Sequence, residues 1–187
     1  MPKRAPEYLS ARREEVLAGA RRCFARWGFE GATVPRLEAE IGLSHGAIFN
    51  YFENKLELFV ELARHDHERW DSIWRNDGFE ALAHAIAHED PDWIAVHLEF
   101  ERRLRTDAAL YERVRTEIGD GADELAWIKE EQKAGRIRDD VPAKALFSFL
   151  HLLLDGLAIA RTAPERKIAL KPILQLARDA LAPRSRP

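Results

Sequence analysis

The stretch TVPRLEAEIGLSHGAIFNYF, residues 33–52, decides how the rest of the chain is interpreted. Thr33 and Ser44 are residue types that cap the start of a helix, and Pro35 is tolerated in a first helical turn. Gly42 breaks the helical pattern between the two caps. The stretch therefore predicts two short helices, the second over residues 45–51, joined by a short turn that contains glycine, which is the arrangement of a helix-turn-helix.

A longer helix precedes this stretch. Between Ser10 and Trp27, apolar residues recur at three- and four-residue spacing, which gives a helix one buried face. Gly28 stands at the position of a C-cap and should end this helix. We therefore assign residues 1–60 to an N-terminal three-helix DNA-binding domain, with the helix-turn-helix at about 33–52.

The chain after residue 52 is also helical in pattern. Turn signals stand at Asn76-Asp77-Gly78 and Asp90-Pro91. Helices are expected over 55–74, around Leu82 and Ile86, and over 93–104, 108–134 (with a bend or break at Gly119 or Gly121), 142–161 and 170–181. Since no hairpin or repeat signal appears, the sequence predicts an all-α chain of about nine helices, with residues 61–187 forming an effector-binding and dimerisation domain.

The helix expected over 142–161 is apolar almost all round. One subunit can cover only part of such a surface. We therefore expect a homodimer formed mainly by the helices over 142–161 and 170–181.

Charge and cysteine content restrict the class of protein. The net charge is -3, yet residues 1–26 hold seven Lys or Arg against three Glu. A basic start on an acidic body argues against a protein that coats nucleic acid indiscriminately and favours phosphate contact at one end only. The single cysteine, Cys23, excludes an internal disulfide, and no apolar signal region precedes the first helix, so a cytoplasmic location is expected. The apolar run over 145–160 falls short of the roughly 20 residues that a bilayer span needs, so no membrane contact is expected.

The second short helix carries the chemistry of base reading. Its N-terminal residues would enter the major groove, where Gly46 lets the backbone come close and His45 and Asn50 supply side-chain hydrogen bonds. Hydroxyl and ammonium groups position a protein on phosphates without reading sequence. The residues with such groups here are Thr33, Ser44, Tyr51 and Lys55.

The segments over 19–24, 28–34, 44–52 and 55–59 resemble the DNA-binding domain of the TetR family of repressors. The resemblance implies a homodimer that places three helices per subunit on each operator half-site and holds an effector in a variable helical body. It implies DNA contacts from Thr33, Arg36, Ser44, His45, Gly46, Ala47, Phe49, Asn50, Tyr51 and Lys55. Two positions depart from the family: Phe49 stands where many relatives carry Tyr, and Pro35 removes an N–H near a helix start.

Beyond residue 60, the segments over 98–100, 103–107, 140–142 and 154–156 look like the branch that contains actinobacterial aconitase repressors. That resemblance implies control of an aconitase gene and an effector made of a tricarboxylate with a divalent metal. No effector-binding residue is assigned from it.

Several polar residues at helical spacing allow more than one interpretation. The pairs His84/His88 and His97/Glu101 fit metal ligation, but solvated helix faces explain them better, so no metal site is assigned. His151 and Asp155, inside an apolar helix, could pair with each other, meet across a dimer interface or contact an effector. For the tryptophans, plain core packing is favoured over a ligand pocket.

No Ser/His/Asp arrangement, paired cysteines or Gly-rich phosphate loop is present, so we expect no enzyme, no catalytic residues and no required cofactor. The favoured hypothesis is a cytoplasmic repressor that binds a palindromic double-stranded DNA operator as a homodimer and is released by a small-molecule effector. The alternative is a helix-turn-helix protein without an effector, whose C-terminal part only dimerises or binds a partner. A small helical enzyme ranks third because it lacks catalytic groups.

Overall fold

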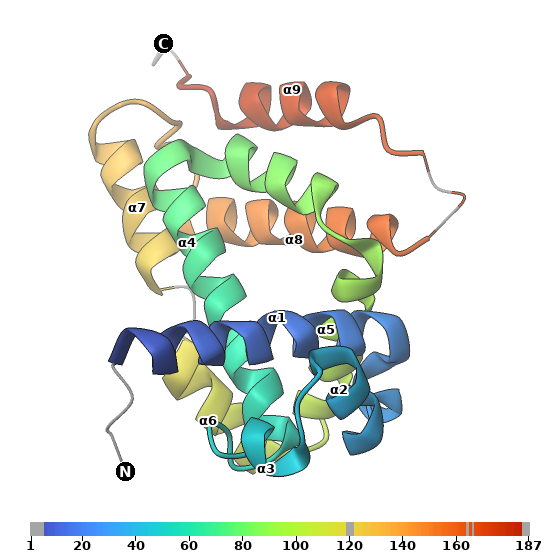
Figure 1. The fold of residues 1–187 in the computed structure, drawn as a ribbon. Helices are drawn as coiled ribbons and strands as arrows, with labels where there is room; N and C mark the ends of the chain where they lie inside the picture. Colours follow the sequence, from blue (N-terminus) through green and yellow to red (C-terminus); the bar gives the residue numbers. More distant parts are fainter. Residues whose placement is uncertain (1–5, 119–121, 164, 166, 185–187) are drawn as a thin grey trace. The chain divides into compact units, whose positions relative to one another are not determined.

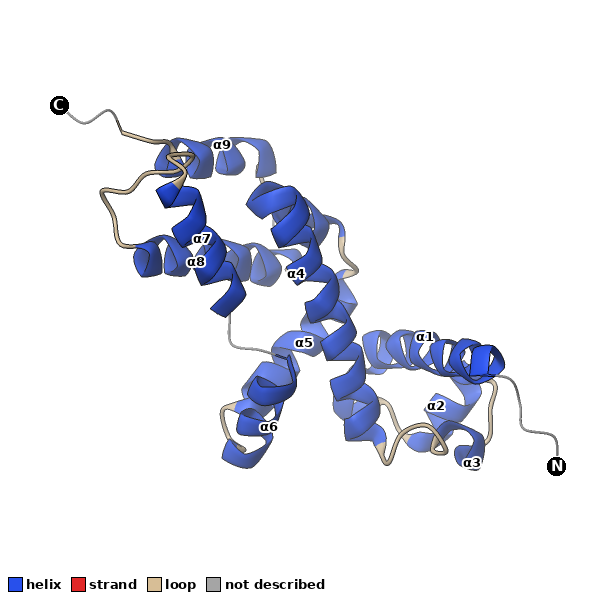
Figure 2. Cartoon of the chain, turned by 90° about the vertical axis from the view of Figure 1, so that its left-hand side faces the viewer, coloured by secondary structure: helices blue, strands red, loops and turns tan. Residues whose placement is uncertain are grey.

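A computed structural model of the chain describes residues 6–118, 122–163, 165 and 167–184. These residues form α-helices connected by turns and loops, and no strand occurs among them (Figure 1, Figure 2). The described helices are α1 (Pro6–Gly31), α2 (Val34–Ile41), α3 (His45–Ile48), α4 (Lys55–His88), α5 (Pro91–Leu104), α6 (Ala108–Ile118), α7 (Ala122–Lys133), α8 (Ala143–Arg161) and α9 (Leu170–Leu181). The predicted all-α class is confirmed.

The chain packs as two compact units. Unit 1 consists of residues 1–66 and 90–114, and unit 2 of residues 67–89 and 115–187. Unit 1 thus contains α1, α2, α3, the start of α4, α5 and most of α6. This division by packing is not a division by function, and the predicted functional boundary after residue 60 stays a prediction.

Helix α1 carries the predicted apolar face, and its members Val16, Ala20, Cys23 and Phe24 are fully buried. Gly28 has a φ of 69° and ψ of 172°, so the regular helix stops there and one further turn follows to Gly31. The C-cap expected at Gly28 is thereby found as a break inside a longer helical segment. Burial raises the pKa of the Cys23 thiol, so this cysteine is a core residue rather than a reactive one.

Aromatic rings fill the core of unit 1. Phe59 of α4 lies against Phe24 and Phe29 of α1 in edge-to-face geometry, with ring centroids 5.2 and 5.3 Å away, and against Phe100 of α5 at 4.5 Å. Trp93, also on α5, is fully buried beside the same ring. Helix α1 packs against both α2 and α5, and Figure 1 shows α2 beside α1. These contacts hold the helix-turn-helix against the core of unit 1.

Unit 2 has its own core, built from the later part of α4, α7, α8 and α9. Its most deeply buried side chains are Trp74, Ala83, Ile128, Leu150, Leu174 and Ala177. The turn predicted at Asn76-Asp77-Gly78 appears as a break in α4, where Gly78 has a φ of 82°. The left-handed backbone there favours glycine because it has no Cβ.

One predicted helix boundary was wrong: the second helix of the helix-turn-helix covers only His45–Ile48 and continues as a turn, rather than reaching Tyr51. The helical stretch expected over 108–134 is found as two helices, α6 and α7, and the glycines at 119 and 121, where a bend or break was expected, lie outside the described residues. The helix expected around Leu82 and Ile86 follows the break at Gly78 and ends at His88.

Candidate nucleic-acid interface

The two short helices are fastened to each other through Glu38 of α2. Its carboxylate accepts the backbone N–H of His45, the first residue of α3, at 2.5 Å. Its backbone carbonyl accepts the N–H of Gly42 at 2.8 Å, and Gly42 has the left-handed φ of 76° that this turn requires. These two bonds give α3 a defined place next to α2 although α3 is only four residues long.

The N-terminal end of α3 lies at the surface. Ser44, His45 and Gly46 are exposed, while Ile48 is fully buried and anchors the helix from below. A Cβ built on Gly46 would meet no atom within 4 Å, so the surface above this residue is open. The open end of α3 therefore offers backbone and side-chain polar groups to a groove, as direct readout of bases requires.

Thr33 and Ser44 occupy the predicted N-cap positions of α2 and α3, but neither side chain makes the capping hydrogen bond. Both residues are exposed, and the described part of the chain supplies no hydrogen-bond partner for either hydroxyl. The expectation of a side-chain cap was wrong in both places, since Glu38 takes over that task at α3. The two hydroxyls are thus available to an external acceptor such as a phosphate oxygen.

Arg36, on the exposed side of α2, is held in place by α1. Its guanidinium donates to the carbonyl of Gly31 at 2.7 Å and stacks 4.0 Å from the ring centroid of Trp27. Trp27 is 41% exposed, which is unusual for a ring of this size. Sequence periodicity placed Trp27 on the buried face of α1, and its role as a support for Arg36 was missed.

Lys55 is engaged within the protein. Its ammonium donates to the carbonyl of Phe29 at 2.8 Å and lies 4.5 Å from the centroid of the Phe29 ring. The start of α4 is thereby tied to the last turn of α1. If Lys55 contacts a phosphate, as expected from the sequence, its ammonium would donate to the phosphate and to the Phe29 carbonyl at the same time.

The remaining residues of the expected interface differ in exposure. Asn50 is exposed, whereas Ala47, Phe49 and Tyr51 are partly buried. The ring of Phe49 packs against that of His45, with centroids 4.7 Å apart. Phe49 can therefore steady His45 even though it lacks the hydroxyl of a tyrosine.

Asp66 of α4 is the buried charge that sequence reasoning missed. It is 3% exposed and accepts hydrogen bonds from Arg21 of α1 at 2.8 and 3.0 Å and from the Trp93 indole N–H at 2.5 Å. The His97 Nε2 lies 3.2 Å from the same carboxylate. A sequence signal existed, because Asp66 follows Leu58 and Leu62 at four-residue steps and so lies on the buried face of α4.

Burial alone would raise the pKa of Asp66. The hydrogen bond from His97 and the charge and hydrogen bond of Arg21 outweigh burial and lower the pKa from 3.8 to about 2. Asp66 is therefore a carboxylate at neutral pH, and it links α1, α4 and α5 through one charged centre.

The histidine pairs considered as metal ligands are used otherwise. The Nδ1 of His88 donates to the carbonyl of His84 at 2.7 Å, and His97 faces Asp66 rather than Glu101. Within the described ranges, no group of three or more His, Cys, Asp or Glu side chains is arranged to hold a metal ion.

Among the buried polar atoms of unit 2 that have no hydrogen-bond partner in the described part of the chain, two lie on neighbouring rings. Trp74 is 1% exposed, and its ring lies 5.6 Å from that of Trp127 and 6.1 Å from that of His151. The Nε1 of Trp74 and the Nε2 of His151 have no hydrogen-bond partner among the described residues. Asp155 is exposed and does not pair with His151. Leaving a buried polar group without a hydrogen bond destabilises a protein by about 1–3 kcal/mol, so a polar ligand that bonded to these two atoms would gain binding energy.

By length and composition alone, α8 is the one described helix that could cross a membrane, although the apolar run over 145–160 was expected to be too short for that. Several of its large side chains, and one on α9, are uncovered in the single chain. They are Phe149 (39% exposed), Leu152 (71%), Ile159 (51%) and Leu176 (68%). This is an apolar surface that needs a cover.

Comparison with known proteins identifies relatives over the whole chain. The sequence pattern described as "Bacterial regulatory proteins, tetR family" matches residues 16–62. The HTH-type transcriptional repressor Rv1474c of Mycobacterium tuberculosis is 38% identical over 187 residues, which cover 97% of this chain and 98% of the relative. The HTH-type transcriptional repressor AcnR of Corynebacterium diphtheriae is 43% identical over 160 residues, covering 83% and 84%.

Solved structures share the fold at low sequence identity. Salmonella enterica GusR superposes with a TM-score of 0.71 at 20% identity, covering 91% of this chain and 95% of the other. A TetR transcription regulator from Haloarcula marismortui gives a TM-score of 0.71 at 22% identity, covering 92% and 97%.

Proposed function

The chain belongs to the TetR family of bacterial regulatory proteins and is a transcriptional repressor of the AcnR type, and from this premise we propose that two copies bind a palindromic operator and leave it when an effector binds. The observation that carries the DNA-binding part is the exposed start of α3, anchored by Ile48 and fastened by Glu38. Its relatives are transcription regulators rather than enzymes.

In this proposal, different residues of the interface contact the bases and the phosphates. His45 and Asn50 reach base edges, and the backbone approaches closely at Gly46 and Ala47. The residues that contact phosphates are Thr33, Arg36, Ser44, Tyr51 and Lys55, while Phe49 supports His45. The exposure of Thr33, Arg36, Ser44, His45 and Asn50 and the free Thr33 and Ser44 hydroxyls support this assignment.

We further propose that the partner covering α8 and α9 is a second copy of the chain. The support is the set of exposed apolar side chains on these helices, of which Leu152 and Leu176 are 71% and 68% exposed. Two such faces packed together would remove this surface from water, and a dimer would place the two α3 helices on half-sites about one DNA turn, or a multiple of it, apart.

The effector is proposed to bind within unit 2, next to Trp74 and His151. Their buried nitrogen atoms lack partners, and a ligand with hydrogen-bonding oxygens would supply them. A tricarboxylate with a divalent metal, and an aconitase gene as the target, remain proposals that rest on the likeness to AcnR. A cytoplasmic location and the absence of membrane contact likewise rest on the relatives being DNA-binding regulators.

The test begins by selecting the operator from random duplexes with the full-length protein. Binding of the selected and a scrambled duplex is then measured across a salt series for wild type, His45→Ala and Asn50→Ala. Each substitution should cost on the order of 1–3 kcal/mol on the operator, relax preference at one position and leave scrambled DNA unaffected. Lys144→Ala, at an exposed site in unit 2, is the control that should bind both duplexes like wild type. If both interface variants did the same, α3 would not be the reading helix.

A further inference from the structure

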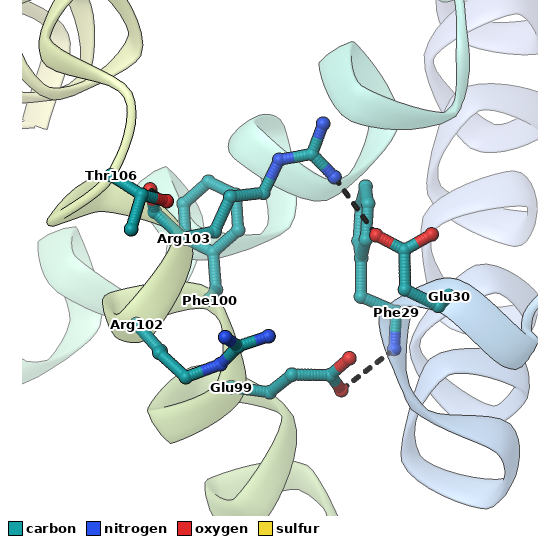
Figure 3. A pocket seen from close by; sticks show the side chains of 7 residues that line it. All are labelled: Phe29, Glu30, Glu99, Phe100, Arg102, Arg103 and Thr106. Atoms are coloured by element: carbon teal, nitrogen blue, oxygen red, sulfur yellow. Dashed lines mark hydrogen bonds and ion pairs between the residues drawn. The ribbon is translucent and has the colours of Figure 1, made fainter.

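A cleft in unit 1 lies beside the last turn of α1, where α5 meets it. It has a volume of about 190 Å³ and is lined by Phe29, Glu30, Glu99, Phe100, Arg102, Arg103 and Thr106. Figure 3 shows the charged side chains of α5 extending toward the end of α1, where Arg103 meets Glu30 and Glu99 meets the backbone of Phe29. Since pockets for drug-sized ligands measure about 300–1,000 Å³, this one suits a smaller guest.

Three of the four charged groups in the cleft take part in contacts of the fold. Arg103 donates to Glu30 at 3.1 Å and lies 5.0 Å from the centroid of the Phe29 ring. The Oε2 atom of Glu99 accepts the backbone N–H of Phe29 at 3.1 Å (Figure 3). Because Arg103 and Glu30 neutralise each other, they leave little net charge for a guest to meet.

Two polar groups of the cleft have no partner among the described residues, while the Thr106 hydroxyl donates to the carbonyl of Arg103. The guanidinium of Arg102 has no hydrogen-bond or ion-pair partner there, and neither has the Oε1 atom of Glu99. The cleft therefore offers one cationic fork of donors and one anionic acceptor, three residues apart on the same helix, beside two phenylalanine rings that are each only 4% exposed. A guest that carries both an anionic and a cationic group can satisfy both.

We propose that this cleft binds a small zwitterion of the α-amino-acid type, with its carboxylate on Arg102, its ammonium on Glu99 and its side chain in the remaining space of the cleft beside Phe29 and Phe100. A guanidinium holds a carboxylate through two parallel hydrogen bonds. A simple anion fits less well because it would lie close to the Glu99 and Glu30 carboxylates, and like charges at short range repel each other.

The site would bear on DNA binding through Glu99. Its carboxylate holds the N–H of Phe29 directly after the break at Gly28, and only a few residues before Thr33 begins α2. A Cβ on Gly28 would lie 3.0 Å from the Glu99 Oε2, so the carboxylate is seated tightly against this break. An ammonium that draws on Glu99 would loosen the turn that positions the helix-turn-helix. This regulatory consequence rests on the proposed function, whereas the binding itself does not.

The experiment is a calorimetric titration of the intact protein, without DNA, using three probes of one shape. L-Leucine carries both charged groups, 4-methylpentanoate lacks the ammonium, and 3-methylbutylamine lacks the carboxylate. Leucine is expected to bind saturably with a Kd on the order of 1 mM, and each analogue at least tenfold more weakly. Saturable binding of 4-methylpentanoate as tight as that of leucine would overturn the zwitterion assignment, as would the absence of saturable leucine binding.

Variants then locate the binding. Arg102→Ala and Glu99→Gln should each weaken leucine binding at least tenfold, while Arg105→Ala, an exposed arginine of the same segment outside the cleft, should not change it. Unchanged binding in Arg102→Ala would show that leucine binds elsewhere and would overturn the site. Circular dichroism of each variant controls for loss of the fold. A leucine effect on operator affinity is measured separately, so failure of the DNA-binding proposal would leave the calorimetric result standing.

Discussion

Replacing Asp66 by Asn should destabilise the protein far more than removing an exposed ion pair. The side chain keeps its size but loses its charge, and the donors Arg21, Trp93 and His97 then face a neutral amide in a buried site. Removing one partner of a buried charge pair costs about 3–5 kcal/mol, because the other charge is left unpaired. The exposed fraction of Arg21, 29%, lets water compensate in part, so we expect a loss of about 3 kcal/mol.

The pH dependence gives a second, independent magnitude. The pKa of Asp66 is lowered from 3.8 to about 2 on folding, a difference that corresponds to about 2.5 kcal/mol. Because the folded-state pKa is the lower one, this stability is fully present above pH 3.8 and is lost as the pH falls towards 2. Asp66→Asn should therefore be less stable at neutral pH and show a flatter loss of stability between pH 4 and pH 2.

The assay is urea unfolding at fixed protein concentration, followed by circular dichroism because Trp93 fluorescence would respond to the substitution itself. Glu30→Gln is the matched control: it also removes a carboxylate from an arginine, but Glu30 and Arg103 have side chains that are 74% and 40% exposed. Exposed pairs contribute about 0–1 kcal/mol. If Asp66→Asn lost no more stability than Glu30→Gln, the reasoning about the buried charge would be refuted.

Three further substitutions test other parts of the molecule. Lys55→Met should lower the free energy of unfolding by about 1 kcal/mol, because the hydrogen bond to Phe29 is lost. It should also reduce the slope of log K for DNA binding against log salt concentration by about one per lost phosphate contact. An unchanged slope would show that Lys55 makes no phosphate contact. Trp27→Leu should weaken binding to operator and scrambled DNA alike by about two- to fivefold, because Arg36 loses a stacking contact worth about 0.5–1 kcal/mol, and Trp27→Tyr should retain most of the affinity. Equal affinities of the Leu and Tyr variants would argue against the support role. Leu152→Asp should sediment as a monomer, whereas Tyr111→Asp, at a 48% exposed site in unit 1, should sediment like wild type; a Leu152→Asp dimer would contradict the proposed interface.

Periodicity and capping residues predicted the helices well where one strong signal acted alone. The bounds of α9 and the end of α8 agree with the predicted ones, since Pro, Gly or polar turns flank a clear apolar pattern there. The sequence also identified Gly28 and Gly78 as breaks, because their positive φ angles favour glycine.

The details that sequence reasoning missed depend on contacts between distant residues. Ser44 was expected to cap α3 with its own hydroxyl, but that hydroxyl makes no capping bond, and Glu38 of the preceding helix instead accepts the N–H of His45. The role of Asp66 was missed because its three partners lie on α1 and α5, and the local sequence around Asp66 does not predict contacts with distant segments. The contact between Trp27 and Arg36 likewise joins two helices, and Trp27 stays 41% exposed beside it.

The brevity of α3 has a consequence for local stability. A helix of four residues is not stable alone, because forming the first turn fixes the backbone angles of several residues but gains only one hydrogen bond. The helix is stabilised instead by the burial of Ile48 in the core and by the hydrogen bond from the His45 N–H to the Glu38 carboxylate. The free energy needed to open this segment is therefore set by its two anchors and can lie well below that of the whole domain, so α3 can fray and reform while α1 and α4 stay folded. Where α3 is frayed in the free protein, the free energy of refolding it is subtracted from the free energy of binding DNA.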